Sequence, residues 1–194
     1  MISGTGSIAL GQDGQGREHR CGGWGWQLDG AGSAMDLGRD GLALSLRMAD
    51  GRLPESALRA RLWAALADAE GITGAAITGQ WIKAQVVAPG FAPAGFARLA
   101  PAVNRLAAGG DPDAARIVQH SANALVELVS GVAERLELTA PAVFATGALT
   151  HLDQLRDRFA AALQSALPAA RLREPRGDAL AGALQVAAAL LSCG

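Results

Sequence analysis

The segment ISGTGSIALG (residues 2–11) decides how the rest of the chain is interpreted. Its centre is a turn with two glycines, Gly4 and Gly6, and two hydroxyl side chains, Thr5 and Ser7. Glycine allows successive backbone N–H groups to point toward one place, which forms a concavity suited to an anion. Phosphoryl transfer depends mainly on positioning and charge stabilisation, and such a turn supplies both. The residues alone favour an ordinary hairpin turn with solvated hydroxyls, and a phosphate-binding turn beside a short strand is the alternative.

Two more glycine-rich stretches follow within the first 32 residues. The stretch GQDGQG (11–16) predicts a turn, so residues 7–10 and 17–21 are expected to pair as a hairpin. The stretch CGGWGW (21–26) predicts a loop in which missing side chains let the backbone approach a ligand. In this loop we expect Trp26 to lie in the core.

From Ser33 onward, glycine-rich loops give way to apolar residues at helical spacing. The expected helices run from Ser33 to near Gly51, over 56–69, over 74–87, over 94–108 and from Pro112 onward. Asp111 is a suitable N-cap for the last of these, and proline is favoured in a first helical turn.

The C-terminal part alternates between strand and helix signals. AVFATG (142–147) predicts a buried strand that ends in a tight turn. A helix over 152–167, a short strand over 170–172 and a final helix over 177–192 are expected to follow. Residues 179–191 are apolar except for Gly182 and Gln185, which predicts a buried helix. The stretch is shorter than the roughly 20 residues that span a bilayer.

This order of elements predicts an α/β fold. We expect a glycine-rich β segment over 1–32, a mainly helical segment over 33–140 and a β-α-β-α segment over 141–194.

Composition and charge exclude several classes of protein. The formal charge is −1 and no basic run is present, so no nucleic-acid partner is expected. No signal peptide is evident, and Cys21 and Cys193 lack the spacing of a disulfide framework, which favours the cytoplasm. The three histidines are not spaced with the cysteines as metal ligands, so no protein-held metal is expected. The histidines are His19, His120 and His151.

Three stretches together resemble one known family: ISGTGSIALG (2–11), GGWGW…GSAMDLGRDGL (22–42) and AVFATGAL (142–149). They are similar to the second half of N-acetylglucosamine kinases and the related BadF/BadG/BcrA/BcrD ATPases, which belong to the actin, hexokinase and sugar-kinase superfamily. In the later part of the chain, short pieces such as GDPDA (110–114) and GDALAGALQVA (177–187) resemble family segments that occur in the same order. The resemblance covers this whole chain but only about half of the family's protein.

The resemblance implies the ribonuclease H-like second lobe of an actin-like ATPase, with a mixed sheet, a helical insertion and packed helices. In the family, a first lobe precedes the SGTGS turn. That lobe carries an Asp-Gly-Gly-Gly-Thr phosphate loop and the catalytic aspartate, and neither is found in this sequence. We therefore expect a C-terminal lobe without its N-terminal lobe, with no catalytic residue of its own. The implied reaction is ATP-dependent phosphorylation of an amino sugar, with ATP and Mg²⁺ bound between lobes.

The resemblance also implies site residues. Those for ATP are Gly4, Thr5, Gly6, Ala94, Gly147 and Ala148. Those for the sugar are Ser7, Gly23, Trp24, Gly25 and Asp29. The assignment of Asp29 departs from the family, which has Gly-Asp-Glu-Gly-Ser after the tryptophan loop where this chain has Asp29-Gly30-Ala31-Gly32-Ser33. Asp29 is the nearby carboxylate, displaced by one residue.

Two other functions remain open at the level of the sequence. One is an activator ATPase of a radical dehydratase or reductase, although Cys21 and Cys193 are not spaced as iron–sulfur ligands. The other is a non-catalytic lobe that acts by association or regulation, which the altered stretch after Asp29 keeps open. The expected partners are an amino sugar and either a second copy of the chain or a separate N-terminal lobe, without a membrane.

Overall fold

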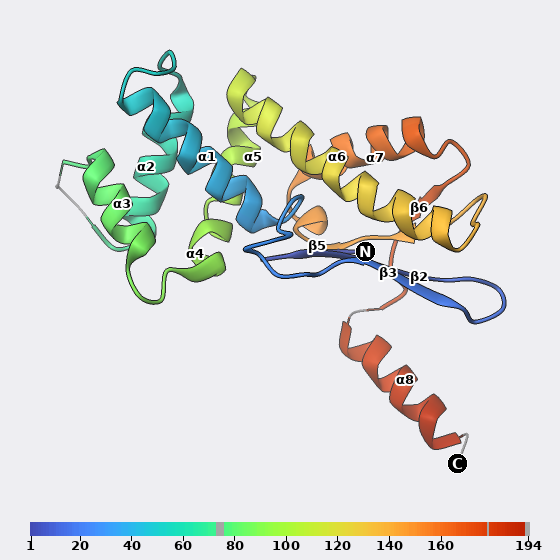
Figure 1. Ribbon diagram of the computed structural model, residues 1–194. Coiled ribbons are helices and arrows are strands. Elements are labelled where there is room, and N and C mark those ends of the chain that lie inside the picture. Colours follow the sequence, from blue (N-terminus) through green and yellow to red (C-terminus); the bar gives the residue numbers. More distant parts are fainter. Residues whose placement is uncertain (73–75, 178, 193–194) are drawn as a thin grey trace.

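A small mixed sheet and a set of packed helices form the structure, a computed structural model that describes residues 1–72, 76–177 and 179–192 (Figure 1). The strands are β1 (Ile2–Ser3), β2 (Ser7–Gln12), β3 (Glu18–Gly22), β4 (Ala142–Phe144), β5 (Thr146–Gly147) and β6 (Arg171–Arg173). The helices are α1 (Ala34–Ala49), α2 (Ala57–Ala69), α3 (Gly79–Val87), α4 (Ala92–Ala97), α5 (Ala100–Ala108), α6 (Pro112–Arg135), the 3₁₀ turn η1 (Ala148–Thr150), α7 (Asp153–Ala166) and α8 (Ala179–Ser192). This mixed architecture confirms the predicted α/β class.

The sheet that carries the opening turn has the strand order β3-β2-β1-β5. β1, β2 and β3 are antiparallel neighbours along the chain, and β5 joins β1 in parallel. A separate two-stranded parallel sheet pairs β4 with β6. The parallel pairing of β1 with β5 brings the start of the chain beside residues 146–147.

Side-chain caps explain where the principal helices begin. Ser33, Ser56, Thr78 and Asp111 each accept a hydrogen bond from a backbone amide in the first turn of the helix that follows. Such caps satisfy amides that have no partner within the helix. The helix expected over 74–87 is shorter in the structure, where α3 begins after Thr78. Positions 74 and 75 lie outside the described residues. Position 178 of the expected final helix lies outside them too.

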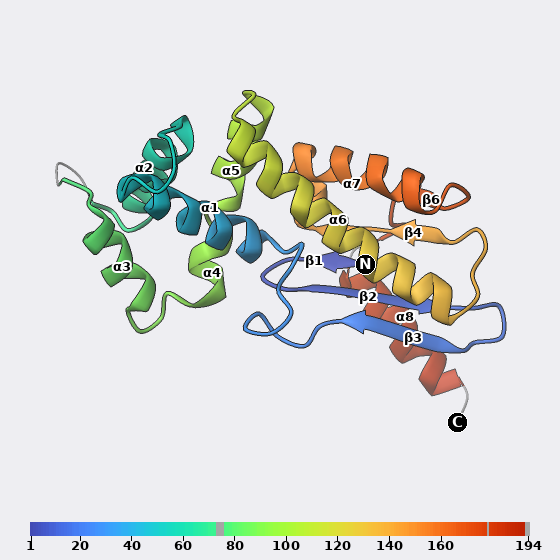
Figure 2. The same ribbon diagram turned by 45° about the horizontal axis from the view of Figure 1, so that its top comes forward.

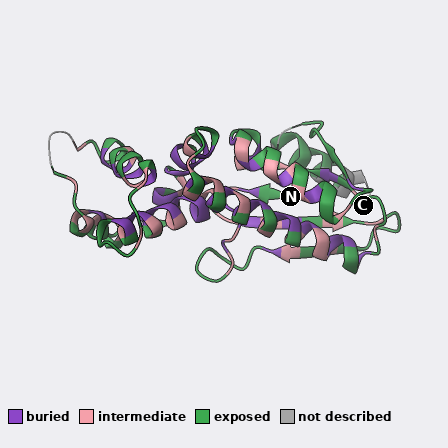
Figure 3. Ribbon diagram, turned by 90° about the horizontal axis from the view of Figure 1, so that it is seen from above, coloured by how far each residue is buried: buried purple, intermediate pink, exposed green. Residues whose placement is uncertain are grey.

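The main core lies among the helices, and α6 also packs on β2 and β3. Figure 1 shows α6 and α7 side by side over one face of the strands, with α1 to α5 forming a helical block at the end of the sheet. Figure 3 shows the buried residues on the inward sides of these helices. The largest fully buried side chains include Phe159, Met35, Leu37, Leu58, Leu62, Leu99, Leu125 and Leu155. This apolar interior is the main source of stabilisation, because burial of apolar surface drives folding.

Two expected elements are divided in the structure. The helix expected over 94–108 is interrupted at residues 98–99 and becomes α4 and α5, with Pro101 in the first turn of the second. Proline lacks an amide hydrogen and favours a helix start, so it supports the interruption. The buried strand expected over 142–147 becomes β4 and β5 in different sheets, and Phe144 in it is 46% exposed.

The final helix is exposed, which corrects the expectation of a buried helix. Leu180, Leu184 and Leu191 are 68%, 62% and 85% exposed. Figures 1 and 2 show α8 beyond the strands, away from α6 and α7. On the strands, Ile2 and Leu10 are also exposed. α8 therefore presents an apolar surface to solvent. Within the described part of the chain, no helix is both long and apolar enough to cross a membrane.

Candidate phosphate and sugar site

The turn between β1 and β2 contains backbone amides that make no hydrogen bond to the described residues. Gly4 donates its amide to the carbonyl oxygen of Gly6 at 2.8 Å and accepts from the amide of Ala34 at 2.8 Å, so its own backbone groups are occupied. Among the described residues, the amides of Thr5 and Gly6 have no hydrogen-bond partner. Thr5 is exposed, and a Cβ added to Gly4 or Gly6 would meet no atom within 4 Å. Two adjacent amides beside open space are donors that a phosphate oxygen can use.

The turn after β5 lies beside this first turn. Ser3 and Gly147 are register partners in the parallel pair, so the strands end at the same edge. Gly147 has φ +77°, and Thr150 Oγ1 donates to its carbonyl oxygen at 2.7 Å. Ala148 follows at the start of η1. Ligands in α/β proteins collect beyond the carboxyl ends of parallel strands, so this edge is a suitable place for a nucleotide.

The loop after β3 holds four of the five expected sugar residues. Gly23 and Gly25 have positive φ angles of +78° and +97°, which favour glycine. Trp24 is 69% exposed, with the guanidinium of Arg20 5.5 Å from its ring centroid. The Asp29 amide donates to the Gly25 carbonyl oxygen at 2.8 Å.

The carboxylate of Asp29 carries an unpaired oxygen. Its Oδ2 is buried and has no hydrogen-bond partner among the described residues. A buried acceptor without a donor is costly, so a ligand hydroxyl there would remove a penalty. Trp26 is 38% exposed, and the expectation that it lies in the core is therefore wrong.

Three buried serines donate hydrogen bonds to backbone carbonyl oxygens at the end of this loop. Ser33 Oγ donates to the Gly30 carbonyl oxygen at 2.6 Å, Ser7 Oγ to that of Ala31 at 2.6 Å, and Ser3 Oγ to that of Gly32 at 2.8 Å. The exposed fractions of these serines are 0% for Ser3, 2% for Ser7 and 0% for Ser33. The Ser7 hydroxyl that was expected beside the sugar thus donates to the loop backbone.

Asp36 fixes the same segment from the first turn of α1. Its Oδ2 accepts from the Gly32 amide at 3.2 Å, and its other oxygen pairs with Arg39. The residue is 1% exposed. Burial raises the pKa of this carboxyl group, the neighbouring Asp40 adds to the rise, and Arg39, the Gly32 amide and His120 oppose it. Sequence reasoning missed Asp36 and the serine bonds, although a Ser33-x-x-Asp36 spacing signals a capped helix start.

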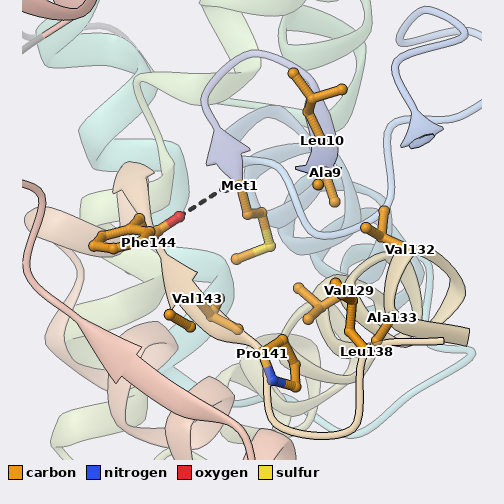
Figure 4. A pocket seen from close by; sticks show the side chains of 12 residues that line it. Met1, Ala9, Leu10, Val129, Val132, Ala133, Leu138, Pro141, Val143 and Phe144 are labelled. Atoms are coloured by element: carbon orange, nitrogen blue, oxygen red, sulfur yellow. Dashed lines mark hydrogen bonds between the residues drawn. The ribbon is translucent and has the colours of Figure 1, made fainter. Parts of the chain in front are cut away.

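Ala94 and an apolar cavity beside β2 lie apart from these groups. Ala94 is exposed on α4, and α4 packs on α1, where the Gly38 position lies against the Phe96 backbone. The cavity has a volume of about 170 Å³. Figure 4 shows its lining, which consists of apolar residues of β2, α6 and the segment 138–144. Its edge includes Met1, whose amino group donates to the Phe144 carbonyl oxygen at 2.7 Å. The cavity offers no polar side chain to a phosphate or a sugar.

The site residues fit phosphate better than they fit a metal. Unpaired amides at Thr5 and Gly6 match phosphate oxygens, whereas no group of three or more metal-ligating side chains occurs among the described residues. Cys21 Sγ lies against Gly131, and burial raises the pKa of its thiol, which disfavours the thiolate that a metal cluster requires.

The mixed sheet with its packed helices is similar in structure to sugar kinases of the actin-like ATPase fold. The chain belongs to the BadF/BadG/BcrA/BcrD ATPase family, whose match covers residues 1–191. This confirms the resemblance carried by the three sequence stretches.

Two similar proteins are sugar kinases by name. The N-acetylmuramic acid/N-acetylglucosamine kinase of Clostridium acetobutylicum is 27% identical over 192 residues, which cover 96% of this chain and 60% of that protein. The crystal structure of a candidate N-acetylglucosamine kinase from Chromobacterium violaceum matches with a TM-score of 0.71 and 28% identity, over 95% of this chain and 57% of that one. The chain thus spans less than two thirds of the length of either protein.

Proposed function

We propose that this chain supplies the second-lobe half of the ATP and sugar sites of an amino-sugar kinase. The observation that carries the proposal is the pairing of Ser3 with Gly147, which brings the two turns to one edge of the sheet. The hydroxyls of Ser3 and Ser7 then hold Gly32 and Ala31, at the end of the sugar loop (residues 23–32), beside the same edge. The amides that would bind phosphate, the turn after β5 that would contact the nucleotide and the loop that would bind the sugar are therefore adjacent. Transfer of a phosphoryl group requires such an arrangement.

Each part of the site has a distinct task. The Thr5 and Gly6 amides and the Thr5 hydroxyl bind phosphate oxygens of ATP, while Gly147 and Ala148 lie against adenosine. Ala94 is assigned to the nucleotide as well, on resemblance alone.

The sugar is held by Gly23, Trp24, Gly25 and Asp29. The exposed Trp24 ring contacts the apolar face of the sugar. Asp29 Oδ2, which is buried without a partner in this structure, accepts from a sugar hydroxyl after the loop adjusts. Ser7 acts on the sugar through the loop that its hydroxyl holds. Because Asp29 replaces the family's acidic pair, its contact determines how well the sugar binds.

These residues bind and orient the reactants. The general base that takes the proton of the sugar hydroxyl, and the groups that hold Mg²⁺, come from outside this set, from a first lobe in the same or a separate polypeptide. ATP supplies the phosphoryl group. We place this reaction in the cytoplasm, with a second copy of the chain or the first lobe as the protein partner.

Calorimetric titration tests the proposal. We expect the purified chain to bind ADP, and to bind N-acetylglucosamine or N-acetylmuramic acid more tightly than glucose. Asp29→Asn, which keeps the size of the side chain but removes its charge, is expected to weaken sugar binding and leave ADP binding unchanged. Absence of binding for every nucleotide and sugar would refute the proposed function.

A further inference from the structure

Ser7 contacts both ends of the loop that begins at Gly23. Its carbonyl oxygen accepts from the Gly23 amide at 3.0 Å, where the loop leaves β3. Its hydroxyl donates to the Ala31 carbonyl oxygen at 2.6 Å, where the loop returns to α1. A single residue of β2 therefore closes the loop at its base.

Ser3 makes a second connection to the loop from the opposite side of the phosphate turn, which comprises residues 4–6. Its hydroxyl donates to the Gly32 carbonyl oxygen at 2.8 Å, and its backbone pairs with Ser7 across the hairpin. Ser3 and Ser7 thus flank the turn formed by residues 4–6. The Gly4 carbonyl oxygen adds a third connection by accepting from the Ala34 amide.

We propose that Ser3 and Ser7 are positioning residues that couple nucleotide binding to sugar binding. Their hydroxyls hold Ala31 and Gly32 against the phosphate turn, so a ligand that fixes one segment also restricts the other. The proposal rests on the proposed function, because it takes the turn as the phosphate site and the loop as the sugar site.

The physical basis of the coupling is the shared cost of ordering. When a nucleotide fixes the turn, the two serines are fixed with it, and the sugar loop then loses less conformational freedom on binding. Coupling is reciprocal, so the sugar must raise nucleotide affinity by the same factor. The Ser3 bond is buried and the Ser7 bond is partly buried. Removal of either hydroxyl leaves a shielded carbonyl oxygen without its donor, which loosens the loop.

Ser121 provides a matched control. It is a buried serine on α6, 1% exposed, and its hydroxyl has no hydrogen-bond partner among the described residues. Ser121→Ala removes a buried hydroxyl without breaking one of the bonds above. Comparison with Ser7→Ala therefore separates the lost bond from the loss of a buried polar atom.

The first measurement is ligand coupling. The sugar dissociation constant of the chain is determined by calorimetry with N-acetylglucosamine, with and without saturating ADP. We expect ADP to tighten sugar binding by about fivefold or more in the unaltered chain. We expect this factor to fall toward one in Ser3→Ala and Ser7→Ala and to persist in Ser121→Ala. An unchanged factor in both serine variants would overturn the proposal.

The second measurement is amide hydrogen exchange without ligand, which decides the matter independently of affinity. We expect faster exchange at residues 30–34 in Ser7→Ala than in the unaltered chain and in Ser121→Ala. Unaltered exchange there would show that the serines do not hold the loop. If exchange accelerates but the unaltered chain binds neither ligand, the proposed function fails and the coupling fails with it.

Discussion

The carbonyl oxygen of Ser3 occupies the position that a Cβ on Gly147 would need. The two residues are partners in the parallel pair of β1 and β5, and Gly147 has φ +77°. Both the close approach and the backbone angle require glycine at this position. The contact between the two turns of the candidate site therefore depends on one missing side chain.

Gly147→Ala is expected to destabilise the fold by about 3 kcal/mol, because it adds a backbone clash to a strained angle. Gly51→Ala is the control, since Gly51 has a similar φ of +78° but open space around it. That variant should lose only about 1 kcal/mol. Urea unfolding measures both, and equal losses would show that β1 and β5 move apart without penalty.

Gly6→Val is expected to weaken ADP binding at least about tenfold, because the added side chain keeps phosphate away from the backbone amides. The side chain meets no protein atom near its Cβ, so the melting temperature should stay unchanged. Gly14→Val, in the open turn between β2 and β3, is the control and should bind ADP normally. Normal ADP affinity in Gly6→Val would limit this turn to a structural role.

Asp36 should make the stability of the chain depend on acid pH. Its pKa is raised from 3.8 in the folded state, so its contribution favours folding below the unfolded value and is lost as the pH rises through the folded value. The free energy of unfolding of the unaltered chain, measured relative to Asp36→Asn by urea titration, is expected to fall as the pH increases over this range. A constant difference between the two proteins would contradict the raised pKa.

α8 is expected to drive self-association, because large exposed apolar surfaces mark interfaces. Sedimentation velocity across a concentration series should show a growing dimer population. Leu184→Gln with Leu191→Gln should reduce it, whereas Val87→Gln, at the exposed end of α3, should not. A strictly monomeric chain at all concentrations would argue against an interface on α8.

The 194-residue polypeptide is expected to bind ligands without measurable kinase turnover. The groups at the site bind and orient, and the resemblance places the general base in the first lobe, so the rate should lack the contributions of both positioning and base catalysis. Coupled detection of ADP release with glucosamine and N-acetylglucosamine measures this. Turnover near the common enzyme value of about 10 per second would contradict it.

Local signals in the sequence predicted most of the elements. Ser33, Ser56 and Asp111 cap helices at the positions where the sequence predicts helix starts. The glycines between β2 and β3 predict the hairpin that these strands form. These features depend on neighbours a few residues away, which a sequence displays directly.

Long-range features of the site were beyond sequence reasoning. The Ser7 hydroxyl could serve a ligand or the backbone, and only the fold reveals Ala31 as its acceptor. Likewise, the stretch AVFATG has the composition of one strand, but its two halves pair with partners from opposite ends of the chain. The roles of individual residues toward ATP and sugar stay predictions.

The pairing of β1 with β5 also determines when the site is completed during folding. The Met1 amino group and the Phe144 carbonyl oxygen that flank this pairing are 143 residues apart in sequence. Closing a loop of that length costs about 4 kcal/mol of chain entropy, whereas helices such as α6 form from local contacts. We therefore expect the phosphate turn to meet the turn after Gly147 late in folding, after the intervening helices have condensed. A chain caught before that step has most of its helices and no nucleotide site.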